Sequence, residues 1–179
     1  MKIACLLADG FEDVEALASA ALLRRAGYIV DFFSVDHQSK VIGSYQTVVT
    51  DIIDINQLHI DDYDALFIPG GKAAFRLRED TRIKEIALSF NQQEKWMLSI
   101  CAAPTVYGMI GLMDGLNYTS FPGTENDMGK GNRINQKAVR DGRFITARSA
   151  GSVYDFVFEI ILAFDGEEAL KAFKEKIVY

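Results

Sequence analysis

The chain has 179 residues, of which 49% are apolar and 25% are charged. These fractions are typical of globular proteins, so they exclude a disordered, collagen-like or low-complexity chain and predict one domain over residues 1–179. The formal net charge of −6 provides no basic surface for nucleic acid or for an anionic membrane. We therefore expect neither as a partner.

Cysteine and histidine are scarce. Cys5 and Cys101 are too few for a disulfide framework, and the first residues show no signal-peptide pattern, so we expect a protein of the reducing cytoplasm. No apolar stretch reaches the ~20 residues that cross a bilayer. His37 and His59 lie far from both cysteines in the sequence, so no metal-ligand spacing exists and we expect no metal site.

The first third of the chain predicts a strand, a helix and a second strand. Residues 2–8 are a continuous apolar run, as in a strand buried on both faces of a parallel sheet. Apolar residues recur at helical spacing over residues 13–26, and Gly27 is placed to end that helix. Residues 28–35 are rich in β-branched and aromatic side chains and complete a βαβ unit with parallel strands.

The same alternation continues to the end of the chain, with a weaker pattern between residues 36 and 60. The remaining predicted elements are one or two short strands within 45–55, strands at 65–68 and 96–100, helices at 81–91, 103–112, 151–164 and 167–176, and an Asp-Gly hairpin at 139–144. This order predicts a flavodoxin-like, doubly wound and mostly parallel sheet in an α/β/α sandwich, with a small antiparallel addition.

Three segments that follow predicted strands carry distinctive chemistry. They are residues 9–15, the Pro-Gly-Gly sequence at 69–71 and the Cys-Ala-Ala-Pro sequence at 101–104. Because ligands of such folds bind at the carboxyl ends of the strands, we expect the three segments to converge.

Cys101 falls where a predicted strand turns into a helix, as the nucleophile of an elbow turn does. The helix N-terminus should let this thiol ionise more readily than a free thiol, whose pKa is about 8.5. The alternative is an inert core thiol between Ile100 and Ala102. For Cys5, inside the first strand, the core interpretation is preferred.

Glu15 is the candidate partner of that thiol, because it lies on the flank of an apolar stripe in the first helical turn. Buried beside a thiolate, it would be a neutral acid that donates a hydrogen bond to sulfur and exchanges protons with a substrate. The alternative is an acidic first turn of Glu12, Asp13 and Glu15 that complements the helix dipole. Periodicity does not decide, because Asp13 lies equally well on the opposite flank.

The Pro-Gly-Gly turn allows the backbone to pass close to a ligand. The amides of Gly70, Gly71 and Ala102 could form an oxyanion hole over Cys101. An ordinary turn is the alternative.

Five segments in this order resemble the ThiJ/PfpI superfamily, in the branch that contains the Parkinsonism-associated protein deglycase and bacterial YajL. The segments are GFEDVEA (10–16), IPGG (68–71), ICAAPT (100–105), TSFP (119–122) and TARSAGS (146–152). The resemblance implies a flavodoxin-like homodimer in which Cys101 is the reactive, oxidisable thiol and Glu15 is the acid bonded to it. Gly70, Gly71 and Ala102 would supply backbone donors, and Arg148 matches an arginine near the family's pocket; a surface arginine is the alternative.

Two positions depart from parts of the family. Protease-like members carry His after the nucleophilic cysteine, where this chain has Ala102, so the resemblance argues against a peptidase. Some glyoxalase-active members have His where Phe121 lies here, and neither His37 nor His59 replaces it. This difference weakens the expectation of rapid glyoxalase turnover, although YajL-like members share the Phe.

Two functions follow from the resemblance. The first is a cysteine-dependent enzyme without a cofactor that acts on small reactive carbonyl compounds, namely 2-oxoaldehydes, or on glycated proteins. The second is a redox-sensing or chaperone-like protective protein with little turnover, in which Cys101 becomes a sulfinic acid. A nucleotide-binding flavodoxin relative is disfavoured, because no G-x-G-x-x-G or P-loop sequence follows a predicted strand.

Overall fold

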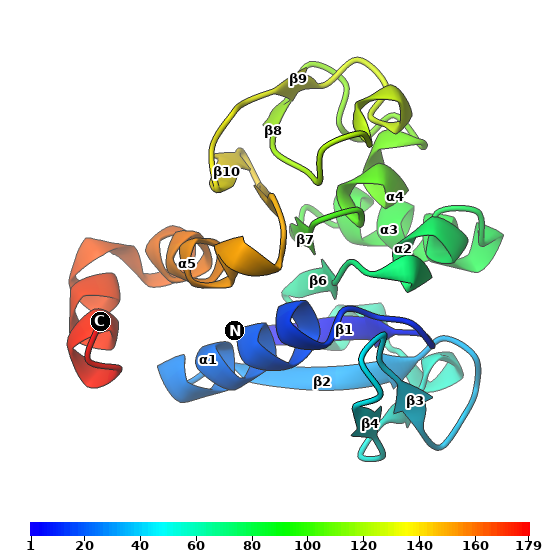
Figure 1. The fold of residues 1–179 in the computed structure, drawn as a ribbon, viewed down its shortest axis with the longest axis horizontal. Coiled ribbons are helices and arrows are strands. Elements are labelled where there is room, and N and C mark those ends of the chain that lie inside the picture. Colours follow the sequence, from blue (N-terminus) through cyan, green and yellow to red (C-terminus); the bar gives the residue numbers. More distant parts are fainter.

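A seven-stranded sheet forms the centre of the computed structural model, which describes residues 1–179 (Figure 1). Its strand order is β10-β11-β7-β6-β1-β2-β5, and all neighbours are parallel except β10 and β11. The strands are β1 (Lys2–Leu7), β2 (Ile29–Ser34), β5 (Ile53–Asp54), β6 (Ala65–Ile68), β7 (Trp96–Ile100), β10 (Ala138–Asp141) and β11 (Phe144–Ala147).

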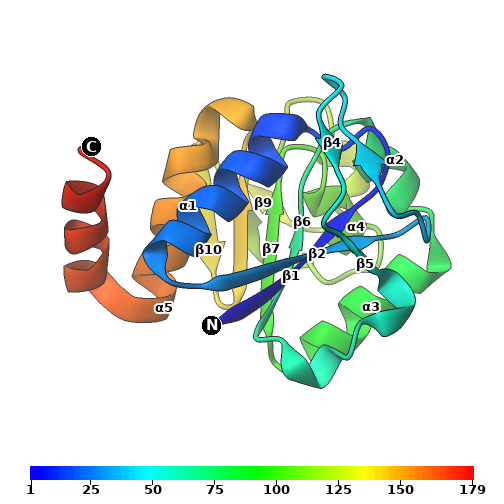
Figure 2. The same cartoon turned by 90° about the horizontal axis from the view of Figure 1, so that it is seen from below.

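Helices cover both faces of this sheet (Figures 1 and 2). On one face α1 packs against α5, and α5 also contacts β10 and β11. On the other face α3 contacts β6 and β7, and α4 packs against both α3 and α2. The helices are α1 (Ser19–Ala26), α2 (Lys72–Leu77), α3 (Thr81–Gln92), α4 (Pro104–Gly108) and α5 (Val153–Lys176). The predicted α/β/α sandwich is confirmed.

Smaller elements extend from the sandwich. An antiparallel pair is formed by β3 (Val41–Ile42) and β4 (Val48–Val49), and a parallel pair by β8 (Asn117–Tyr118) and β9 (Asn132–Arg133). One π-helix, η1 (Val14–Ala18), precedes α1, and the 3-10 turns are η2 (Ile55–Gln57), η3 (Ile60–Asp62), η4 (Glu125–Asp127) and η5 (Ala150–Ser152).

The apolar run at the start of the chain becomes the central strand. All residues of β1 after Lys2 are buried, and Cys5 lies between Phe32 of β2 and Phe67 of β6. One cluster of 48 buried residues spans the sheet and both helical layers. A single core of this kind supports the expectation of one domain.

Two turns form at their predicted places, although the Asp-Gly pair of the hairpin is divided between strand and loop. Gly27 ends α1 with φ 106°, in the left-handed region that glycine adopts without steric cost. In the hairpin Asp141 pairs with Phe144, so Gly142 and Arg143 are the loop, and Gly142 has φ 55°. Glycine at the first loop position is typical of a two-residue hairpin.

The helix predicted at residues 103–112 is shorter in the structure, where α4 ends at Gly108. Gly108 packs so closely on the backbone of Asp127 and Met128 that a Cβ would lie 2.5 Å from the Asp127 carbonyl oxygen. Gly111 then takes φ 77°, which is incompatible with a continuing helix. Tertiary contact thus ends this helix before its apolar pattern ends.

The two closing helices of the prediction are the two halves of α5, which are separated by a non-helical Gly166. No helix in the structure combines the length and the apolar composition that crossing a membrane requires.

Candidate functional site

The three segments singled out in the sequence meet at the carboxyl ends of β1, β6 and β7, which are neighbours in the sheet. Phe11 and Gly71 form an isolated antiparallel bridge, and the Glu12 amide donates to the Gly70 carbonyl at 3.1 Å. The loop after β1 is therefore bonded directly to the Pro-Gly-Gly turn. The predicted convergence is confirmed.

Glu15 is fully buried at this meeting point. It lies in η1, a π-helical turn of a kind that occurs frequently at functional sites. Its Oε2 accepts a hydrogen bond from the Gly70 amide at 2.9 Å, and its own amide donates to Glu12 Oε2 at 2.7 Å. Its Oε1 forms no hydrogen bond of normal geometry. A buried carboxylate oxygen without a donor is costly, whereas a protonated Oε1 could itself donate.

Burial raises the pKa of Glu15 to about 7, because the carboxylate loses its hydration inside the protein. The Cys101 thiol opposes this rise by hydrogen bonding to the charged form, and the negative charge of Glu12 adds to it. The amides of Gly70 and Ala150 also favour the charged form. A substantial fraction of Glu15 is therefore a neutral acid at neutral pH.

Cys101 occupies the strained turn between β7 and α4. Its φ of 65° is rare for a residue with a side chain, and such conformations concentrate at functional sites. The turn is fixed on both sides, because its amide donates to the Ala147 carbonyl at 2.9 Å and its carbonyl accepts from the Phe121 amide at 2.8 Å. Cys101 is partly exposed, whereas Cys5 is fully buried. The inert-core alternative therefore fits Cys5 and does not fit Cys101.

The prediction that the Cys101 thiol ionises more readily than a free thiol is wrong, because burial favours the neutral thiol. Burial raises the pKa of Cys101 to about 12, and the Glu15 carboxylate adds to the rise by charge repulsion and by holding the thiol proton. The amides of Ala102 and Gly71 act in the opposite direction. A neutral Glu15 removes the repulsion, so the two ionisations are coupled.

The glycines allow the carboxyl, the thiol and the turn to approach one another. A Cβ on Gly70 would lie 2.5 Å from Glu15 Oε2 and 2.6 Å from the Cys101 Cβ, so no larger residue fits. Gly71 has φ 87° and would likewise collide with the backbone of Gly10 and Glu12. The two amides differ in use, because that of Gly70 is bonded to Glu15 and that of Gly71 acts on Cys101. The Gly70 amide is therefore used by Glu15, and the candidate donors to the Cys101 sulfur are the amides of Gly71 and Ala102.

A cavity of about 220 Å³ opens over the thiol. It is lined by Gly71, Lys72, Phe75, Cys101, Ala102 and Phe121. Phe121 thus lies where the sequence predicted, whereas Lys72 and Phe75 were not anticipated. They follow the Pro-Gly-Gly turn at the first and fourth positions of α2, and the signal that could have found them is this i, i+3 spacing directly after the turn.

Arg148 does not line this cavity, so its predicted place in the pocket is not supported. Its Nε donates to the Gln136 carbonyl at 3.3 Å and its Nη2 to Asn135 Oδ1 at 3.0 Å. These two bonds direct the guanidinium toward the loop before β10.

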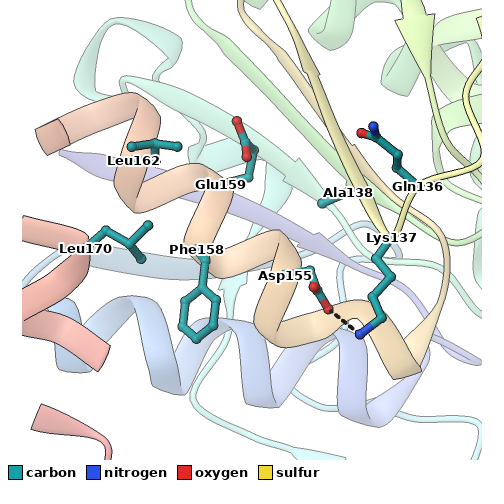
Figure 3. Close-up of a pocket in the computed structure, with 8 residues that line it drawn as sticks. All are labelled: Gln136, Lys137, Ala138, Asp155, Phe158, Glu159, Leu162 and Leu170. Carbon is teal, nitrogen blue, oxygen red and sulfur yellow. Dashed lines mark ion pairs between the residues drawn. The ribbon is translucent and has the colours of Figure 1, made fainter. Parts of the chain in front are cut away.

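A larger hollow of about 430 Å³ lies between β10 and α5 (Figure 3). Its charged side chains are paired, because Lys137 Nζ lies 3.5 Å from Asp155 Oδ2, and Glu159 Oε1 lies 3.2 Å from Arg140 Nε. No cysteine or histidine lines it. The smaller cavity therefore contains the candidate chemistry.

Residues 1–163 match the DJ-1/PfpI family. The chain belongs to this family. Among its DJ-1/PfpI relatives, Deglycase PfpI of Pyrococcus furiosus is 29% identical over 163 residues, which cover 90% of this chain and 98% of that protein. Protein dj-1beta of Drosophila melanogaster is 28% identical over 169 residues, covering 93% and 90%.

Solved DJ-1 structures have the same fold. The crystal structure of Drosophila melanogaster DJ-1beta superposes with a TM-score of 0.91 at 26% identity, covering 99% of this chain and 97% of that one. Oxidised Toxoplasma gondii DJ-1 superposes with a TM-score of 0.92 at 25% identity, covering 99% and 98%. The DJ-1/PfpI fold therefore extends over essentially the whole chain.

Proposed function

We propose that the chain is a cysteine-dependent protective enzyme of reactive 2-oxoaldehydes or of their adducts on proteins, and that it needs no cofactor. The observation that carries this proposal is the buried Glu15 carboxyl beside the partly exposed Cys101 thiol, under an open cavity. Relatives that are named deglycases support the same class of substrate.

The first step joins the aldehyde to the protein. The Cys101 sulfur attacks the aldehyde carbon, and the proton held by the Glu15 and Cys101 pair passes to the aldehyde oxygen, which gives a hemithioacetal. Gly71 and Ala102 line the cavity together with Cys101, and their amides would stabilise negative charge that develops beside the sulfur.

The second step moves a proton along the substrate. The Glu15 carboxylate removes the proton from C1 of the hemithioacetal and returns it to C2, which leaves a thioester on Cys101. Water then hydrolyses the thioester, so R–CO–CHO and one H₂O become R–CHOH–COOH and the free thiol returns. C1 is oxidised while C2 is reduced, and the reaction needs no external oxidant or reductant.

Methylglyoxal tests this proposal. Purified protein should convert it to lactate without glutathione or added metal, because both the nucleophile and the proton carrier belong to the chain. Cys101→Ser should lose at least 100-fold in rate, since an alcohol is a much weaker nucleophile near neutral pH. Cys5→Ala is the matched control and should retain the rate, because it leaves no unpaired hydroxyl at this fully buried position. Lactate production is measured enzymatically.

Lactate formation that persists in Cys101→Ser would overturn the mechanism. The redox-sensing alternative predicts a different result, in which no lactate forms and mild peroxide adds two oxygens to Cys101 and none to Cys5. The different exposure of the two thiols favours such selectivity. Mass spectrometry of the oxidised peptides separates these outcomes.

A further inference from the structure

Lys72 has no ionic partner although it lines the cavity with Cys101. It forms no salt bridge and no side-chain hydrogen bond. The two arginines that follow it are both paired: Arg76 bonds to Asp36 at 2.6 and 2.7 Å, and Arg78 to Asp127 at 2.6 Å. Lys72 is therefore the unpaired cation of this segment.

Lys72 is also the one charged side chain in the lining of the cavity. The Glu15 carboxyl of the site is fully buried and bonded to the Gly70 amide. Glu12 has one carboxylate oxygen bonded to the Glu15 amide. The cavity thus presents an unneutralised ammonium group on a molecule whose net charge is −6.

Two aromatic side chains accompany this ammonium group. Phe75 lies one turn after Lys72 on α2, and Phe121 also lines the cavity. Arg78, rather than Lys72, is positioned over the Phe75 ring, at 5.0 Å from its centroid. The ring is held in place without neutralising Lys72, and apolar walls strengthen the attraction of a cation for an anionic ligand.

We propose that Lys72 is a specificity-determining residue that selects substrates carrying a carboxylate or phosphate in addition to the aldehyde. Lys72 and Cys101 line the same cavity of about 220 Å³, so an anion bound by Lys72 lies close to a carbonyl carbon at the thiol. The substrate class is anionic 2-oxoaldehydes. This specificity rests on the proposed function, whereas the attraction of anions to Cys101 does not.

The first experiment measures anion selectivity without turnover. Iodoacetate and iodoacetamide both alkylate Cys101 by forming an S–C bond and releasing iodide, and they differ in one negative charge. The ratio of their rates on Cys101, followed by peptide mass spectrometry, should fall about three- to tenfold in Lys72→Met, the range expected for one nearby charge. Lys72→Glu should lower the ratio further, and 1 M salt should reduce the difference between variants.

Lys171→Met is the control for removing a positive charge elsewhere, because Lys171 lies on the C-terminal half of α5. Its rate ratio should equal that of the wild type. An unchanged ratio in Lys72→Met, or an equal fall in Lys171→Met, would overturn the proposal. Lys72 is exposed, so neither substitution at this position removes a buried contact.

The second experiment measures turnover with a matched pair of substrates. 4,5-Dioxopentanoate is a 2-oxoaldehyde with a terminal carboxylate, and one water converts it to 2-hydroxyglutarate by the proposed reaction. Its methyl ester removes the charge. The ratio of kcat/KM for the acid to that for the ester should fall in Lys72→Met by a factor similar to that of the alkylation ratio.

The two experiments separate the two proposals. A shifted alkylation ratio without turnover of either aldehyde would support anion recognition by Lys72 and contradict the proposed function. Turnover whose acid-to-ester ratio is the same in wild type and Lys72→Met would support the proposed function and overturn the specificity.

Discussion

At the scale of single residues, the site depends on a carboxyl whose protonation is coupled to that of a thiol. Glu15 in a folded molecule holds its proton more tightly than in an unfolded one, because burial raises its pKa from 4.5 to about 7. Glu15 therefore contributes stability that is fully present below pH 4.5 and is lost as the pH rises through 7. The residue that the proposed mechanism uses as an acid thus lowers the stability of the folded protein near neutral pH.

Glu15→Gln tests this coupling. The free energy of unfolding of the variant minus that of the wild type should be up to about 3 kcal/mol larger above pH 8 than at pH 4.5. This is the free energy that corresponds to the pKa difference of Glu15. The glutamine amide cannot ionise, so the variant should lack the fall in the free energy of unfolding that Glu15 causes between pH 4.5 and 8. Urea unfolding measured across this pH range provides the free energies.

Glu168→Gln is the matched control, because Glu168 is exposed on α5. It should follow the wild-type pH dependence. If the Glu15→Gln and wild-type curves run parallel, Glu15 is charged in the folded protein, and its proposed role as a neutral acid fails.

At the scale of elements, α5 shows how one residue redirects a helix. Gly166 has φ 83° and ψ −176°, a combination open essentially to glycine alone. After this break the chain returns toward the first half of α5, where the Tyr179 ring packs at 4.7 Å from Phe158 and stacks at 5.5 Å on Tyr154. The aromatic cluster at the C-terminus therefore depends on the break.

Gly166→Ala should destabilise the protein by about 1–3 kcal/mol, the cost of forcing a side chain into this backbone region. No atom lies within 4 Å of the position of an added Cβ, so the loss would come from the backbone and not from a collision. Gly151→Ala is the same substitution at a position with ordinary φ and no near neighbour below 4.0 Å, and it should change stability little. Thermal unfolding measures the stability of both variants. Equal stability would show that alanine adopts the backbone conformation of residue 166 without strain.

At the scale of the whole molecule, an exposed apolar surface near the site supports a homodimer. Val14, Tyr45 and Val48 are 49%, 75% and 51% exposed. They belong to neighbouring segments, because Asp13 accepts hydrogen bonds from the Tyr45 amide at 2.9 Å and from the Thr47 amide at 3.1 Å. We propose that a second copy of the chain covers this surface.

Sedimentation equilibrium should therefore give twice the 19.9 kDa mass of the chain. Val48→Lys should shift the equilibrium toward monomer, because it introduces a charge into the proposed interface. Ile29→Lys changes an equally exposed apolar residue at the start of β2 and should leave the mass unchanged. A monomer at micromolar wild-type protein would contradict the homodimer.

Much of this fold could be predicted, because its strands are buried apolar runs with clear ends. Residues 65–68 and 96–100 match β6 and β7 without error. The short strands β4 and β5 lie within the predicted range 45–55, whereas β3, β8, β9 and the six-residue α2 could not be predicted, because so few residues show no periodicity. Lys72 therefore went unnoticed although it adjoins a predicted turn.

The candidate site, too, could be predicted only in part from the sequence. Cys101, Glu15 and Gly71 follow neighbouring strands, and the parallel topology alone brings their segments together. The direction of the Cys101 pKa depends on the desolvation of two coupled groups, which no spacing in the sequence encodes. The position of Arg148 likewise depends on the carbonyl of a distant loop residue, Gln136.

The position of Cys5 has a practical consequence. Its sulfur lies in the central strand with β2 on one side and β6 on the other, and burial raises its pKa. A thiol reagent can reach it only after the sheet itself has separated. The labelled fraction of Cys5 therefore measures how many molecules are unfolded, and the labelled fraction of Cys101 measures how many sites are accessible. Comparing the two fractions in one sample distinguishes an inactive variant that is folded from a variant that is misfolded.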